Sequence, residues 1–203
     1  FQRMLATDFQ AYHNFRYGVS FVTPKEVQKE LLQKGSTMLS YFIGKENRIM
    51  AFVIQKNAFH AIDCPVVENL DSLVEVFRQG LFGYYGLPSS RRSDEIFENS
   101  VRQYIAAGQT LYDVLLAPVE ALLSSEVIIV PDGLLAKIPF ELLLTAKPAN
   151  ELHFKEYPYW FKVKNHSVSY TYSATLLREM TQKRHQLIPT RSLFALAPFF
   201  PGN

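Results

Sequence analysis

The stretch that most constrains the fold is Glu126–Thr145, which reads EVIIVPDGLLAKIPFELLLT. Its first part, Val127–Val130, is a short apolar run rich in β-branched residues, the composition of a strand buried on both faces. Pro131-Asp132-Gly133 ends the run, because proline removes a ladder donor and Asp-Gly supplies a turn with a positive φ. Pro139 is then placed to open a short helix. The pattern predicts the centre of an α/β core. Taken alone, these residues indicate only that the stretch is packed in the core.

Composition and charge exclude several classes of protein. The 203 residues are enough for one substantial core. A content of 48% hydrophobic and 20% charged residues is typical of a globular chain and not of a disordered one. The net charge of +2 gives no electrostatic argument for nucleic acid. A single cysteine, Cys64, excludes an internal disulfide and a cysteine metal cluster, and it fits a reducing, cytoplasmic setting.

The sequence shows no targeting or membrane segment. No apolar run approaches the roughly 18 to 20 residues that a membrane span needs, so we expect no membrane contact. Residues 1–30 lack a basic region followed by an apolar one, so we expect no signal peptide. Because the sequence begins at Phe1 and not at methionine, we expect a segment of a longer or processed protein.

Residues 1–17 predict an amphipathic helix. Its apolar face carries Phe1, Met4, Leu5, Phe9, Tyr12 and Phe15, and its polar face carries Gln2, Asp8, Gln10, Asn14 and Arg16. An aromatic stripe at helical spacing indicates packing, either on the body of this domain or on helices that precede it.

The next part predicts a helix followed by strands. Thr23-Pro24-Lys25-Glu26 combines an N-cap, a proline at the first helical position and a glutamate at capping-box spacing, and Gly35 is placed to cap the helix end. Residues 37–43 and 48–56 are β-rich and are joined by a polar four-residue turn, which predicts a hairpin. Residues 58–62 are a candidate third strand.

Helices and strands alternate farther along the chain. Apolar spacing predicts helices at 66–82, 95–107 and 110–123, with an exposed loop at 83–94 and an interruption at Pro118. After the central stretch, the sequence predicts a strand at 167–172, a helix from 174 to about 185 that Ser173 caps, and a strand at 192–196.

This order predicts an α/β fold with a mixed, largely parallel sheet flanked by helices, preceded by a β-hairpin subdomain and an N-terminal helix. We divide the chain into an N-terminal helix and linker from a preceding helical region (1–23), a hairpin and helical subdomain (24–110) and the first part of the α/β core (111–203). Open sheets of this kind bind ligands beyond the carboxyl ends of their strands, which here include Pro131–Gly133 and Ala197–Asn203.

Candidate catalytic residues are few. Ser173 lies between a strand and a helix without the glycines of a nucleophile elbow, so we interpret it as a helix cap. His60 and Cys64 are about 13 Å apart along a strand at roughly 3.3 Å per residue, and we interpret Cys64 as a small buried residue. The five histidines lack H-x-x-x-H or H-E-x-x-H spacing, so we expect no metal site. No glycine motif for phosphate is present, and we expect no cofactor.

The region from Glu151 to Asn203 has seven basic residues against three acidic ones. This excess is typical of a solvated helix face. Two other interpretations stay open, a docking patch for an acidic partner and an RNA-binding surface.

The central stretch resembles the signature of CHAT domains, which are caspase-like, separase-related cysteine peptidase domains often fused to tetratricopeptide repeats. The family pattern is an apolar strand, Pro-Asp-Gly and then Pro-Phe-Glu. The matching residues, which we interpret as structural, are Pro131, Asp132, Gly133, Pro139, Phe140 and Glu141. The hairpin at 38–54 and the segments Leu111–Pro118 and Val168–Ala174 also resemble family elements, so the resemblance covers about residues 25–200.

The resemblance implies a caspase-like fold and a cysteine endopeptidase that cleaves a protein substrate under the control of a partner. Family members use a histidine in a His-Gly-type motif and a cysteine in a Ser-Ala-Cys-type motif, and this sequence contains neither. We therefore expect the chain to be the N-terminal portion of the domain, inactive alone, with its catalytic dyad after Asn203. Pro198, Pro201, Gly202 and Asn203 are the candidate residues for one wall of the substrate cleft.

The expected partners are a protein substrate, the catalytic half of the same domain, and preceding helical repeats or a regulatory protein. Nucleic acid is expected to act only indirectly, if at all. Relatives with tetratricopeptide repeats often serve prokaryotic defence, so the resemblance also implies that role. The alternative is a non-catalytic pseudo-peptidase or adaptor that docks through residues 1–17 and the basic C-terminal region.

Overall fold

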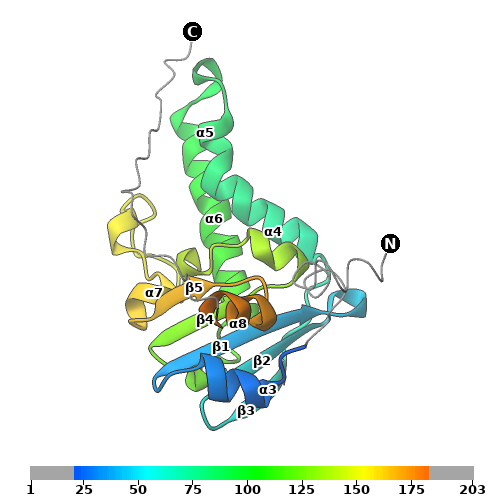
Figure 1. The fold of residues 1–203 in the computed structure, drawn as a ribbon. Helices are drawn as coiled ribbons and strands as arrows, with labels where there is room; N and C mark the ends of the chain where they lie inside the picture. The colour runs from blue at the N-terminus through cyan, green and yellow to red at the C-terminus, as the bar shows by residue number, and fades with distance from the viewer. Residues whose placement is uncertain (1–20, 183–203) are drawn as a thin grey trace, which may run out of the picture.

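A five-stranded sheet lies at the centre of the computed structural model, which describes residues 21–182 (Figure 1). The strands are β1 (Ser36–Ile43), β2 (Ile49–Gln55), β3 (Phe59–Asp63), β4 (Glu126–Val130) and β5 (Ser167–Tyr170), in the order β3-β2-β1-β4-β5. β2 is antiparallel to both of its neighbours, and β4 is parallel to both β1 and β5. Since every strand except β2 runs in one direction, the predicted mixed, mostly parallel α/β sheet is confirmed.

The helices pack around this sheet. They are α3 (Pro24–Glu26), α4 (Leu70–Arg78), α5 (Tyr84–Gly86), α6 (Asp94–Leu115), α7 (Trp160–Val163) and α8 (Ala174–Gln182). The π-helical turns Val27–Leu31 and Gln79–Gly83 continue α3 and join α4 to α5. Figure 1 shows α4 to α6 as a helical hairpin whose tip at α5 projects away from the sheet.

The two faces of the sheet have different coverings. Alternate residues of the strands, such as Leu39 and Ile129, belong to the main core together with apolar residues of α4 and α6. On the opposite face, Met38 and Val130 pack against the turn Val27–Leu31 and against α8. The second cluster is much smaller, so this face carries less helix than the first.

The helix start at Thr23 is confirmed. Glu26 N donates to Thr23 Oγ1 at 3.3 Å, and Thr23 N donates to Glu26 Oε2 at 2.7 Å, which completes a capping box. The helical turns end at Leu31, however, so the prediction that Gly35 caps the helix was wrong. Gly35 has a φ of +92° in the turn before β1, where its carbonyl accepts the N–H of Glu126 at 3.2 Å. The left-handed conformation of Gly35 therefore belongs to the turn that links the start of β1 to the start of β4.

Residues 94–115 form one helix, so the predicted division near residue 108 was wrong. Gly108 lies inside α6, and a Cβ there would be 3.3 Å from the Phe77 ring. Glycine at this position lets α6 approach α4 closely instead of ending the helix. The exposed loop expected at 83–94 is also shorter than predicted, because helical backbone continues through Gly86. The interruption at Pro118 is confirmed, since α6 ends at Leu115 and a separate 3-10 turn, Glu120–Leu122, follows.

Some of the remaining predicted elements are confirmed, and others lie outside the described residues. The hairpin and the third strand are confirmed, and β5 ends at Tyr170, two residues before the predicted end. Ser173 caps α8, because its Oγ accepts the N–H of Leu176 at 3.0 Å. The helix predicted at 1–17 and the strand predicted at 192–196 lie outside the described residues. No described helix combines the length and the apolar character that crossing a membrane requires.

Candidate functional site

The parallel strands β4 and β5 end side by side. Ile129 pairs with Tyr170, and Thr171 N donates to the Ile129 carbonyl at 3.0 Å. A cavity of about 250 Å³ opens beyond these strand ends, and its lining residues are Pro131, Ala136, Tyr170, Thr171 and Tyr172. Open parallel sheets bind their ligands in this position, beyond the carboxyl ends of the strands. We call this cavity the strand-end cleft.

The Pro131-Asp132-Gly133 turn ties the end of β4 to the end of β1. Ile43 N donates to Asp132 Oδ2 at 2.8 Å, so the carboxylate satisfies the last amide of β1. Gly133 has a φ of +51°, in the left-handed region that favours glycine. Leu135 N donates to the Asp132 carbonyl at 3.0 Å and so starts the 3-10 turn Gly133–Lys137. The turn therefore fixes one side of the strand-end cleft.

Phe140 is buried between two tyrosine rings. It has no exposed surface, and its ring centroid lies 5.5 Å from that of Tyr41 and 6.4 Å from that of Tyr170. Pro139 precedes it as the cap of the 3-10 turn Phe140–Leu142, so the short helix predicted at Pro139 is a single turn that begins one residue later. Through Phe140, the 3-10 turn Phe140–Leu142 packs on both β1 and β5.

Tyr170 joins the 3-10 turn Phe140–Leu142 to the strand-end cleft. Its hydroxyl accepts the N–H of Phe140 at 2.9 Å and donates to Glu141 Oε2 at 2.5 Å. Burial first, and then the hydrogen bond to Glu141, raise the pKa of Tyr170 far above its ordinary value. The phenol therefore stays protonated and keeps donating. Glu141 in this way holds a side chain of the cleft wall in place.

The strand-end cleft is suited to binding and not to bond cleavage by its own residues. No cysteine, histidine or carboxylate is among its lining residues. Two of its three hydroxyls are engaged, since Tyr170 donates to Glu141 and Thr171 Oγ1 donates to the Ser173 carbonyl at 3.2 Å, and the third belongs to the exposed Tyr172. The described part of the cleft therefore offers shape and apolar surface, without a nucleophile or a base.

Cys64 lies at the opposite edge of the sheet and is buried, as predicted. Its N–H donates to the Ile49 carbonyl at 2.9 Å, while His60 pairs with Val53. The two residues therefore follow one strand direction, about 13 Å apart at roughly 3.3 Å per residue. Three strands separate β3 from β5. The structure brings His60 and Cys64 neither to each other nor to the strand-end cleft.

The Cys64 thiol is expected to be unreactive in the folded protein. Burial first, and then the neighbouring Asp63 charge, raise its pKa to about 11, so the nucleophilic thiolate is scarce at pH 8. Alkylation of the folded chain by iodoacetamide should therefore be much slower than in urea, where the ordinary thiol pKa is about 8.5. Because the folded pKa is the higher one, this group stabilises the fold below pH about 8.5, and that contribution is lost as the pH rises toward 11. A folded thiol that half-titrates near pH 8 would contradict this assignment.

The other described histidines also lie away from the cleft. His153 is exposed and 3.9 Å from Glu156. The His166 ring packs against Trp160 in a tilted arrangement with ring centroids 4.9 Å apart, next to the amino end of β5. Within residues 21–182, no group of three or more His, Cys, Asp or Glu side chains is arranged to hold a metal ion. His13 and His185 lie outside the described residues.

The residues predicted from the sequence to line the cleft, Pro198, Pro201, Gly202 and Asn203, lie outside the described residues and stay a prediction. The sequence placed Pro131 at a strand end where such sheets bind ligands, but sequence reasoning missed Ala136, Tyr170, Thr171 and Tyr172. A signal for two of them was present, because the predicted strand 167–172 ended at Tyr172. Applying the strand-end rule to that strand as well would have placed Thr171 and Tyr172 beside Pro131.

Comparison with known proteins gives one family match. Residues 106–198 match the CHAT domain model. The matched segment runs from the middle of α6 through β4 and β5, and it contains every residue that lines the strand-end cleft. No curated protein matches the chain.

Proposed function

Because residues 106–198 belong to the CHAT domain family, which is caspase-like and peptidase-related, we propose that this chain is the N-terminal part of a cysteine endopeptidase that cleaves a protein substrate. The position of the strand-end cleft carries the proposal. The signature turn at Pro131 and the end of β5 meet at the carboxyl edge of the parallel strands, where sheets of this kind hold their substrates.

In this proposal the catalytic cysteine and histidine come from outside residues 1–203. The sequence contains neither family motif, and Cys64 is buried with a raised pKa. In the complete site, a thiolate attacks the scissile carbonyl carbon, histidine transfers protons as base and then acid, and backbone N–H groups hold the oxyanion. The described residues contribute the sheet that carries these groups and one wall of the cleft.

The outer edge of β5 is the place where the cleft would be completed. Among the described strands β5 pairs only with β4, and α8 follows it on the less covered face. The strand predicted at 192–196 would then return parallel to β5 by a right-handed crossover. In that arrangement Pro198–Asn203 would follow a strand end next to Thr171, which is the wall predicted from the sequence.

The cleft lining favours an apolar group of the substrate. None of its residues is charged, and Tyr172 is 88% exposed, so its ring is available to a bound peptide. Aromatic side chains contribute large contact areas at low conformational cost. Control by a partner, preceding helical repeats and a role in prokaryotic defence are parts of the proposal that rest on the resemblance to the family.

A peptidase assay with a cleft variant tests the proposal. The full-length product of the gene, together with its regulatory partner, is expected to cleave a protein substrate, whereas residues 1–203 alone should not. In the active protein, Ala136→Trp should fill the cleft and raise KM several-fold with a smaller effect on kcat, because Ala136 lines the cavity and is exposed.

The matched control is Ala149→Trp, since Ala149 is also exposed but does not line the cleft. It should leave KM unchanged. Equal KM values for the two variants would contradict the assignment of the strand-end cleft as the place where the substrate binds. A full-length protein that binds partners but cleaves none, with no cysteine required, would support the adaptor alternative instead.

A further inference from the structure

One face of the sheet is left partly open and is aromatic. Strand register places Phe42 on β1, Phe52 on β2 and Phe59 on β3 on the face opposite α4 and α6. Phe42 is 54% and Phe59 is 47% exposed, and the rings of Phe52 and Phe59 stack at 6.1 Å. Met50 and Ala61 lie on the same face, and Asp63, which pairs with Met50, lies at its border. We call this surface the open face. Burying it would stabilise the molecule by about 25 cal/mol for each Å² of apolar area removed from water.

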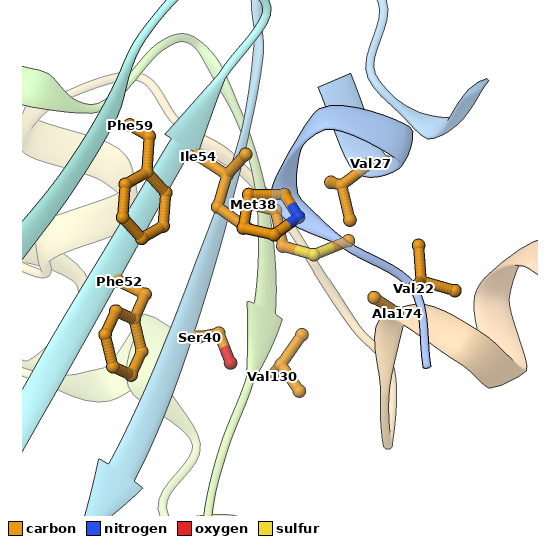
Figure 2. Close-up of a pocket in the computed structure, with 10 residues that line it drawn as sticks. Val22, Val27, Met38, Ser40, Phe52, Ile54, Phe59, Val130 and Ala174 are labelled. Atoms are coloured by element: carbon orange, nitrogen blue, oxygen red, sulfur yellow. The ribbon is translucent and has the colours of Figure 1, made fainter. Parts of the chain in front are cut away.

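The open face continues into a groove. The groove has a volume of about 290 Å³, and it is lined by Val22, Pro24, Val27, Met38, Ser40, Phe52, Ile54, Phe59, Val130 and Ala174. Figure 2 shows Phe52 and Phe59 on one side, Val27, Val22 and Ala174 on the other, and Met38 between them. No lining residue is charged, and Ser40 is its one hydroxyl-bearing residue. The lining fits an apolar side chain from a covering helix.

Residues 1–20 are the segment of this chain placed to cover it. The first described residue is Phe21, and Val22 already lines the groove, so the segment ends at the groove itself. Its residues 1–17 have the spacing of an amphipathic helix, with an apolar stripe that includes Leu5, Phe9 and Tyr12. Such a helix would be about 26 Å long at 1.5 Å per residue. The seven residues of β2 span about 23 Å, so the lengths match.

Tethering favours this segment over a separate partner. A helix joined to the groove by only a few residues is present at an effective concentration of the order of millimolar or higher. The sequence places Gly18 between the predicted helix and Val22, and glycine permits the backbone conformations that a reversal of the chain onto the sheet would need.

We propose that residues 1–17 form a helix that docks on the open face of the same molecule, with its aromatic stripe over Phe42, Phe52 and Phe59. The proposal is independent of peptidase activity. The docked helix would also contact the strand that leads to the strand-end cleft, because Val130 lines the groove and the next residue, Pro131, lines the cleft.

The test measures the accessibility of a cysteine placed on the open face. In a Cys64→Ala background, Ala61→Cys puts a small thiol there, since Ala61 pairs with Phe52 and its side chain is exposed. In residues 1–203 this thiol should be labelled slowly by a maleimide dye. Adding Phe9→Asp should speed the labelling by at least about tenfold, the factor that corresponds to 1.4 kcal/mol of docking free energy.

Two controls complete the experiment. Gln10→Asp, on the polar face of the predicted helix, should leave the labelling slow. A reporter Ser72→Cys, exposed on α4 at the other face of the sheet, should react rapidly in every variant. Rapid labelling at position 61 without Phe9→Asp would overturn the proposal. So would slow labelling that persists with Phe9→Asp, and in that case a rate that increases on dilution would identify a second copy as the cover.

Discussion

Replacing Phe140 by alanine is expected to lower the free energy of unfolding by about 3–5 kcal/mol, the usual cost of truncating a buried phenylalanine. The side chain has no exposed surface and lies between Tyr41 and Tyr170. These two rings belong to β1 and β5, on either side of β4. Their hydroxyls are held by the Leu115 carbonyl and by Glu141, so neither ring is free to collapse into the cavity.

Urea unfolding followed by circular dichroism measures this change. Phe82→Ala is the matched control, because Phe82 is also a phenylalanine but is 57% exposed, and its loss should cost less than about 1 kcal/mol. Similar losses of unfolding free energy for both variants would mean that Phe140 is not packed between Tyr41 and Tyr170. The Phe140→Ala variant should also loosen Tyr170, and with it the wall of the strand-end cleft.

Gly80→Ala is expected to cost about 3 kcal/mol or more, at or above the upper end of the usual range for overpacking. A Cβ at position 80 would lie 2.6 Å from the Tyr104 backbone nitrogen and 2.8 Å from its Cα. Because these atoms belong to the backbone of α6, no side-chain rotation relieves the contact. The helical hairpin would have to separate at this point.

Gly86→Ala provides the comparison for Gly80→Ala. Gly86 lies in α5, and a Cβ there would meet no atom within 4 Å. Alanine has the higher helix propensity, so this substitution should be neutral or stabilising by up to about 1 kcal/mol. The difference between the two midpoints of thermal unfolding is the measurement. Equal midpoints would contradict the close approach of the turn Gln79–Gly83 to α6.

The parts of the fold that follow from local chemistry were predictable from the sequence. The β-branched run at 127–130 became β4 between two parallel neighbours, and the capping box at Thr23 formed as its spacing requires. The turn at Asp132 and Gly133 adopts the positive φ that Asp-Gly favours. These features depend on residues that lie within four positions of each other.

Features that depend on distant contacts were not predictable. The sequence predicted a break between two helices at Gly108, yet this glycine lies inside α6 and allows a close contact with Phe77. The sequence predicted a helix through Gly80 but gave no sign that this glycine allows a close contact with Tyr104. The wall of the strand-end cleft combines residues near 131 with residues near 171, and only the register of β4 with β5 brings them together. The open face became visible only once strand register had placed Phe42, Phe52 and Phe59 on one side.

We propose that residues 1–203 build the scaffold and one wall of a peptidase cleft whose nucleophile lies outside these residues. The most direct measurement is covalent labelling of the full-length, activated protein with a peptidyl electrophile directed at cysteine, followed by mass spectrometry. We expect a label on a cysteine outside residues 1–203, lost when the protein is unfolded, and no label on Cys64, which is buried with a pKa of about 11. Modification of Cys64 in the native protein, or peptidase activity of residues 1–203 alone, would contradict it.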